Sequence, residues 1–216
     1  DSKGLQSAGR AILTTDLVEK SASITVRIDN HDVTISGIAK GSGMIHPNMA
    51  TMLGFILTDV DINQSLLQKA IKYSVDKTFN MISVDGDTST NDMVLAIANG
   101  EANNTCIKEE CGNYKLFLNA LIEVNKYLAK SIAKDGEAAT KLIEVEVYGC
   151  KSEENAKKIA KSVISSCLVK TAIFGGDPNW GRVIAAMGYS GADFDPKKVS
   201  IYFQGAPGYI CVLKNG

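Results

Sequence analysis

Thr51 stands where a stretch of small and turn-forming residues meets an apolar segment, within the run from Gly41 to Phe55. A hydroxyl is a weak nucleophile at neutral pH unless a base removes its proton, and a threonine whose preceding peptide bond has been cut carries that base as its own α-amine. The unperturbed pKa of such an amine is about 7.7–8, which is close enough to working pH to accept a proton. The pattern makes Thr51 a candidate N-terminal nucleophile, although most threonines that precede a strand are there only as β-formers.

Two further features lie upstream of Thr51. Lys40 could supply an ammonium group, although a solvated lysine at the end of a loop is the ordinary interpretation. Gly41-Ser42-Gly43 is similar to a phosphate-binding loop, but it has neither the GK[ST] ending nor the following helix that such loops need. We therefore do not predict a nucleotide site from this stretch.

The elements that must position these residues are predicted from hydrophobic periodicity. Residues 23–28 and 33–38 alternate apolar and polar side chains on either side of 29–32, which indicates a β-hairpin. Residues 52–57 are continuously apolar, which is typical of a strand buried on both faces. Thr51 is thus expected to head a core strand.

The rest of the chain mixes helices with strands. Helices are predicted at 61–79, 93–98, 114–134, 153–169 and 177–187, and strands at 81–84, 142–147, 199–203 and 209–213. We expect Asp61 to cap the first of these helices and Asp177, followed by Pro178, to cap the last. Hairpins mixed with helices, without a repeating βα unit, predict an α/β (α+β) fold in which helices cover the outside of antiparallel-rich sheets.

Composition excludes several classes of protein. The 216 residues are 45% hydrophobic and 22% charged, as in a globular chain. The 23 basic and 24 acidic residues form no large block of one sign, so no nucleic-acid partner is predicted. Five irregularly spaced cysteines and two histidines indicate neither a metal site nor a disulfide framework, and they favour a reducing compartment, the cytoplasm. No stretch approaches the roughly 20 apolar residues of a membrane span, so no membrane partner is expected.

Four stretches together point to a family. Residues 37–53 closely resemble the self-cleavage segment of the ornithine acetyltransferase family, also called the glutamate N-acetyltransferase or arginine-biosynthesis J family. Residues 85–92, 135–141 and 174–182 are similar to further segments of that family, in the same order. The resemblance covers essentially the whole chain. It implies a layered α-β-β-α sandwich of the type that processes itself to expose an N-terminal threonine nucleophile.

The resemblance also implies a precursor that cuts itself between Ala50 and Thr51. Residues 1–50 would be the end of the α-chain and residues 51–216 most of the β-chain, the two forming one compact unit. Thr51 would take the acetyl group from N-acetylornithine as an ester and pass it to glutamate, in a ping-pong reaction. Acetyl-coenzyme A would be a second donor in bifunctional members. No resident cofactor or metal is implied, and the cleaved chains are expected to form a heterotetramer of two αβ pairs.

Two other site residues follow from the resemblance. Lys40 matches the family's substrate-contacting lysine, whose ammonium suits a carboxylate. Glu137 matches the family's substrate-binding glutamate, whose carboxylate can hold an amino group of ornithine or glutamate. The stretch at 174–182 receives no catalytic role, because a helix cap at Asp177 and packing by Trp180 explain much of it.

The chain departs from the family pattern at both ends. Family members carry a preceding segment whose Thr-Gly pair forms the oxyanion hole, and a following tail that reaches the substrate. We therefore interpret the chain as an internal portion of a longer enzyme and expect it not to turn over substrate alone, since losing one oxyanion donor costs about 10²–10³ in rate. Two alternatives stay open, a related self-processing aminopeptidase and a non-catalytic domain or inactive fragment of the transferase. The pairing of Lys40 with Glu137 favours the transferase.

Overall fold

The computed structural model describes residues 2–46, 52–206 and 208–216, which fall into two compact units. The units are Asp1–Ala139 and Thr140–Gly216. We expected 51–216 to form one compact unit with 1–50, whereas the division lies far beyond residue 51, at a position that no composition change marks. Both units combine helices with strands, and the predicted α/β class is confirmed.

The first unit is built on a four-stranded sheet in the order β1-β2-β3-β4. Its strands are β1 Lys20–Ile28, β2 His31–Lys40, β3 Leu53–Thr58 and β4 Met93–Ala98. β1 and β2 form the predicted antiparallel hairpin, and its turn residues Asp29 and Asn30 have φ values of 48° and 64°. Asp and Asn tolerate this left-handed conformation, which two-residue hairpin turns require. β2 then pairs antiparallel with β3, and β3 pairs parallel with β4.

The predicted helix at 93–98 is wrong, because these residues form β4. Exposure alternates along all six residues, from exposed Met93 to half-buried Ala98, which is the period of a strand. A parallel neighbour of β3 needs a long crossover, and α2 Gln64–Lys77 lies within that crossover. A six-residue stretch is also short for a helix.

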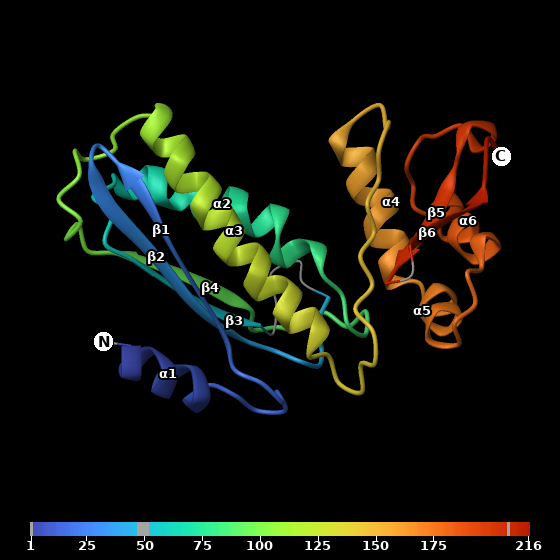
Figure 1. The fold of residues 1–216 in the computed structure, drawn as a ribbon, viewed down its shortest axis with the longest axis horizontal. Helices are drawn as coiled ribbons and strands as arrows, with labels where there is room; N and C mark the ends of the chain where they lie inside the picture. The colour runs from blue at the N-terminus through green and yellow to red at the C-terminus, as the bar shows by residue number, and fades with distance from the viewer. Residues whose placement is uncertain (1, 47–51, 207) are drawn as a thin grey trace. The chain divides into compact units, whose positions relative to one another are not determined.

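Two helices, α2 and α3 Gly112–Lys134, cover one face of this sheet (Figure 1). The predicted long helix at 114–134 is confirmed as α3, whose buried side chains Phe117, Leu121 and Leu128 form much of the core. α2 begins three residues later than expected. Its N-cap is Asn63 rather than Asp61, because the Asn63 side chain accepts the hydrogen bond from Ser65 N.

The other face of the sheet carries exposed apolar side chains on β3 and β4. Leu57 is 44% exposed, Leu95 42% and Ile97 50%. These side chains belong to the same face, because Leu57 is in register with Ile97 and Leu95 lies two residues before Ile97. The expectation that β3 is buried on both faces is therefore wrong. Helix α1 Ser2–Ala11, which was not predicted, packs beside β1 and β2.

Gly37 is enclosed where β2 passes beneath α3. A Cβ at this position would lie 2.7 Å from Ile56 Cδ1 and 2.9 Å from Leu128 Cδ1, both in the packed core. We expect Gly37→Ala to lower the free energy of unfolding by about 1–3 kcal/mol, because the core must shift to admit the methyl group. Urea denaturation measures this. The matched control is Gly112→Ala, where a Cβ has open space; equal effects of the two substitutions would contradict the packing argument.

The segment between α2 and β4 differs from prediction. The expected strand at 81–84 is wrong: residues Phe79–Met81 form a short 3₁₀ helix, η1, and an irregular loop follows. Phe79 is 1% exposed and packs into the core, so the apolar residues here are buried without strand pairing.

In its described residues, the second unit contains three α-helices, a 3₁₀ turn and a two-stranded sheet. These are α4 Glu153–Ser165, α5 Cys167–Phe174, α6 Trp180–Gly188, η2 Pro196–Lys198, β5 Ile201–Gly205 and β6 Gly208–Leu213. The two late strands were predicted. The single predicted helix at 153–169 is instead divided at Ser166, whose side chain accepts from Val169 N and so starts α5. α6 begins after Asn179, which caps it by accepting from Arg182 N, so the expected cap at Asp177 is wrong.

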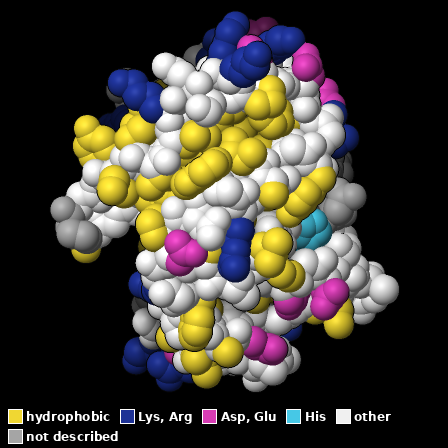
Figure 2. Space-filling view, turned by 90° about the vertical axis from the view of Figure 1, so that its right-hand side faces the viewer, with side chains coloured by type: hydrophobic (Ala, Val, Ile, Leu, Met, Phe, Trp, Pro, Cys, Tyr) yellow, Lys and Arg dark blue, Asp and Glu magenta, His cyan; other side chains and the backbone are white. Residues whose placement is uncertain are grey.

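Residues 142–147 keep the alternation that predicted a strand, but the structure shows them in no ladder with any described residue. Val145 and Val147 pack on an apolar cluster to which α4, α5 and α6 contribute, while Tyr148 is 82% exposed. Other apolar side chains of this unit are also exposed, among them Phe174 and Tyr209. Figure 2 shows hydrophobic side chains gathered in a band on one face of the molecule.

Within the described part of the chain, none of the helices has the length and apolar character to cross a membrane.

Candidate active site

The predicted nucleophile Thr51 and the predicted cleavage residue Ala50 lie outside the described residues. The described chain stops at His46 and resumes at Met52. The site is therefore built from the segments on either side of this gap and from the residues that contact them.

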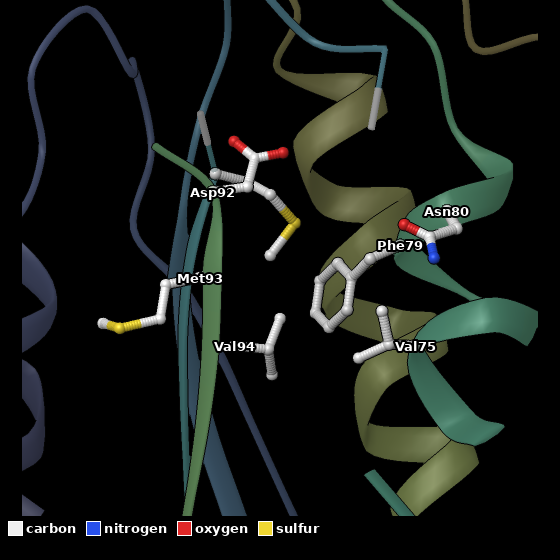
Figure 3. A pocket seen from close by; sticks show the side chains of 7 residues that line it. Val75, Phe79, Asn80, Asp92, Met93 and Val94 are labelled. Carbon is white, nitrogen blue, oxygen red and sulfur yellow. The ribbon is translucent and has the colours of Figure 1, made fainter. Parts of the chain in front are cut away.

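Met52, the residue directly after Thr51, is anchored in the first unit. It is 1% exposed, and its carbonyl accepts a hydrogen bond from Met93 N at 3.0 Å. Met52 lines a small, mainly apolar pocket in which Val75, Phe79 and Val94 point toward one another, as Figure 3 shows. The start of β3 is thus held between β4 and the end of α2. These contacts fix the position of Met52, the residue immediately after Thr51.

The segment before the gap is held by the loop that follows η1. The Asp85 carboxylate accepts hydrogen bonds from Met44 N at 2.6 Å and from Ile45 N at 3.0 Å. Val84 N donates to Ile45 O at 2.6 Å. The polar stretch at 85–92 therefore supports the candidate cleavage segment. This role was not predicted. An aspartate in a turn-rich loop is expected to accept hydrogen bonds from backbone N–H groups, but the sequence does not say which residues donate them.

Lys40 ends β2 and is half-buried. Its Nζ donates to Thr14 Oγ1 at 3.1 Å, and the neighbouring hydroxyls of Thr15 and Ser42 lie 2.6 Å apart. The Thr14-Thr15 pair thus lies beside Lys40 and Ser42. These two threonines were not predicted as site residues, since nothing local marks a contact between segments so far apart in the chain.

Glu137 lies on the same loop from another direction. Its backbone N donates to Ser42 O at 2.9 Å, and a Cβ built on Gly43 would lie 2.6 Å from Glu137 Oε1. Glu137 therefore contacts Ser42 and Gly43, the second and third residues after Lys40. An ammonium and a carboxylate in this arrangement can bind the two oppositely charged groups of an amino acid.

A buried ion cluster lies behind this loop. Lys20 is 1% exposed, and its Nζ donates to Asp16 Oδ1 at 2.7 Å, to Asp135 Oδ2 at 2.6 Å and to Val18 O at 3.2 Å. Asp16 Oδ1 also accepts from Gly41 N at 2.6 Å. Burial alone would raise the pKa of the Asp16 carboxyl, but the hydrogen bonds from Lys20 and Gly41 and the lysine charge outweigh it and lower this pKa.

This lowered pKa predicts how stability depends on pH. A carboxyl with a lower pKa in the folded state stabilises the fold fully above its unfolded pKa, about 3.9, and loses that contribution as the pH falls through the folded pKa. We expect the free energy of unfolding to fall as the pH drops below about 4. Urea denaturation between pH 5 and pH 2 tests this, with Asp16→Asn as comparison. An equally steep loss in the Asp16→Asn variant would show that Asp16 is not a source of the effect.

The stretch at 174–182 has a structural role in the second unit. Arg182 donates to Leu168 O at 2.8 Å and to Thr171 Oγ1 at 3.0 Å, which ties α6 to α5. Trp180, which was expected to pack, is 47% exposed. Among the residues that the structure describes, no group of three His, Cys, Asp or Glu side chains could hold a metal ion.

A family model described as the ArgJ family matches residues 2–216. The chain belongs to the ArgJ family. The family predicted from the residues around Thr51 is thus confirmed, and the match includes Lys40 and Glu137. It also includes Thr14, Lys20 and Asp135, which lie around the same loop.

Relatives and a solved structure agree with the ArgJ match. The chain is 54% identical to the arginine biosynthesis bifunctional protein ArgJ of Caldanaerobacter subterraneus subsp. tengcongensis, over 99% of this chain and 53% of that protein. It is 58% identical to ArgJ 1 of Clostridium acetobutylicum, over 90% of this chain and 48% of that protein. The crystal structure of ArgJ from Bacillus halodurans is similar with a TM-score of 0.71 and 46% identity, covering 76% of each chain. The chain spans about half the length of the curated relatives it matches.

Proposed function

We propose that this chain belongs to an arginine-biosynthesis enzyme that transfers an acetyl group from N-acetylornithine to glutamate, with Thr51 as the nucleophile. The observation that carries the proposal is the contact of Glu137 with Ser42 and Gly43, which lie two and three residues after Lys40 in the segment that leads to Thr51. Membership of the ArgJ family supports it.

The proposed nucleophile first has to be released. The Thr51 hydroxyl attacks the Ala50 carbonyl carbon, the C–N bond breaks, and the amine of Thr51 takes up a proton as an ester replaces the amide. Water then hydrolyses this ester and leaves a chain that begins at Thr51, whose α-amine can serve as the base. The support from the structure is the anchoring of both flanks, by Asp85 before the gap and by Met93 after it.

Acetyl transfer then uses the same hydroxyl twice. Thr51 Oγ attacks the acetyl carbonyl of N-acetylornithine, and ornithine leaves with its amine protonated. The glutamate amine attacks the acetyl ester and restores the hydroxyl, which gives N-acetylglutamate. One covalent intermediate shared by two substrates makes the kinetics ping-pong.

The charges beside the loop suit amino-acid substrates. Lys40 can pair with a substrate carboxylate, and Glu137 can pair with an amino group such as the side-chain ammonium of ornithine. A self-processing aminopeptidase is the alternative, in which water resolves the acyl intermediate. The Lys40 and Glu137 pair fits an amino-acid acceptor better than a free peptide terminus.

Further properties of the enzyme belong to the same proposal. We propose that the two cleaved chains associate into a heterotetramer of two αβ pairs and that acetyl-coenzyme A can serve as a second acetyl donor. The proposed compartment is the cytoplasm, where the five cysteines, all free in the structure, would stay reduced.

The test uses the protein at its full natural length, incubated with N-acetylornithine and isotope-labelled glutamate. We expect labelled N-acetylglutamate, parallel lines in double-reciprocal plots, and two fragments whose masses sum to the uncut mass plus one water. A parallel reaction with acetyl-coenzyme A and no N-acetylornithine tests the second donor. Hydrolysis of peptide amides without acetyl transfer would instead support the aminopeptidase.

A further inference from the structure

Lys20 is a fully buried lysine whose hydrogen-bonding capacity is matched to its surroundings. An ammonium has three N–H donors, and Lys20 Nζ has three acceptors, Asp16 Oδ1, Asp135 Oδ2 and Val18 O. The side chains of Lys20 and Asp16 are 0% exposed and that of Asp135 is 6% exposed. Burying such a group is costly, and well-packed apolar residues often give equal or greater stability. Fold stability alone therefore explains this cluster poorly.

The first carboxylate of the cluster leads to Lys40. Asp16 Oδ1 accepts from the backbone N of Gly41, the residue after Lys40, and Asp16 Oδ2 accepts from Thr14 N at 3.3 Å. Thr14 in turn receives the hydrogen bond from Lys40 Nζ. Asp16 thus holds both the backbone beside Lys40 and the hydroxyl group that its ammonium contacts.

The second carboxylate leads to Glu137. Asp135 follows the last residue of α3 and lies two positions before Glu137, whose N is bonded to Ser42 O. Asp135 Oδ2 also accepts from Leu17 N at 3.0 Å. Lys20, together with the backbone N–H groups of Leu17 and Val18, therefore joins the segment contacting Lys40 to the turn carrying Glu137.

We propose that Lys20 is a positioning residue, which sets the separation of Lys40 and Glu137 by holding Asp16 and Asp135 on one ammonium group. The inference rests on the proposed function, because it gives Lys40 and Glu137 their substrate. Lys20 touches no substrate itself. It acts by orienting the side chains of Lys40 and Glu137 before the substrate binds.

The first measurement is acetyl transfer by Lys20→Met in the full-length protein. We expect kcat/KM for N-acetylornithine to fall about tenfold or more, mainly through a higher KM, because a small displacement of positioning groups is costly. The matched control is Lys151→Met, which breaks an ion pair of similar length with Asp193 at an exposed site. That variant is expected to behave like the unaltered protein.

A double-mutant cycle separates positioning from general loss of structure. If Lys20 acts through Lys40, Lys20→Met should raise KM much less in a Lys40→Ala background than in the unaltered protein. Full additivity of the two substitutions would overturn the inference. So would an unchanged KM in a folded Lys20→Met variant.

Asp135→Asn covers the case in which Lys20→Met does not fold. This substitution keeps the size of the side chain and an acceptor oxygen for Leu17 N; it removes the negative charge facing Lys20 and turns the other carboxylate oxygen into an NH₂ group. We expect the same rise in KM and the same coupling to Lys40→Ala; a normal KM would overturn the inference. Absence of transfer activity in the unaltered full-length protein would instead refute the proposed function, so the two failures are distinguishable.

Discussion

Replacing Thr51 with alanine is expected to abolish both self-cleavage and acetyl transfer. The substitution removes the only proposed attacking oxygen, and loss of a covalent nucleophile typically lowers kcat by about 10⁴–10⁶-fold. In the full-length protein, intact-mass spectrometry should then give a single uncut species, with no added acetyl group after incubation with N-acetylornithine. Because one hydroxyl serves both reactions, the two losses should appear together.

Two variants control this experiment. Thr25→Ala removes an exposed hydroxyl of β1 that lies 3.3 Å from the Thr34 hydroxyl, and this variant should cleave and transfer normally. Thr51→Ser keeps an attacking oxygen and should retain part of both activities. Cleavage after Ala50 in the Thr51→Ala protein, or acetyl transfer by that protein, would refute the assignment of the nucleophile.

Replacing Gly43 with alanine is expected to damage substrate binding far more than stability. A Cβ at Gly43 would lie 2.6–2.8 Å from the carboxylate atoms of Glu137, the end of a flexible and exposed side chain. The carboxylate can swing away at little cost to the fold, but it then leaves its position beside Gly43, where we propose that it binds substrate. We expect kcat/KM to fall about 10²-fold, and the free energy of unfolding to change by under about 1 kcal/mol. Steady-state kinetics and urea denaturation on one preparation test both parts.

The effect of Gly43→Ala should depend on Glu137. In a Glu137→Ala background the added methyl group has no carboxylate to displace, so Gly43→Ala should then change kcat/KM little. Gly112→Ala again serves as the control at an open position. If Gly43→Ala lowers kcat/KM as much in the Glu137→Ala background as in the unaltered protein, the methyl group acts on something other than Glu137.

The parts of the fold that could be predicted are those whose signal is local. The β1–β2 hairpin is encoded by alternation on both sides of Asp29-Asn30, and α3 by a long helical period. β4 could not be predicted in the same way. It is a strand because it pairs with β3, and the whole crossover that contains α2 separates β3 from β4 in sequence. The division of 153–169 at Ser166 was missed because a serine inside an apolar period looks like a surface residue until its side chain is seen to cap the next helix.

The site residues were predicted on a different basis, and their roles stay predictions. Lys40 and Glu137 came from resemblance to a family and not from any pattern of their own. Thr14 and Asp85 were missed, since they contact the loop through hydrogen bonds to residues 26 and 41 positions away. Hydrogen-bonding residues in irregular segments have no periodicity that would reveal their partners.

The pairing of β2 with β3 has a consequence for a protein cut between Ala50 and Thr51. The ladder from Ile35↔Thr58 to Lys40↔Leu53 joins residues on opposite sides of that bond. In the uncut chain this ladder is closed by a connecting loop, so unfolding is unimolecular. After a cut, the same hydrogen bonds would hold two separate molecules, and unfolding would release both of them. The sheet would then be a subunit interface whose stability rises with protein concentration, although no side chain in it had changed.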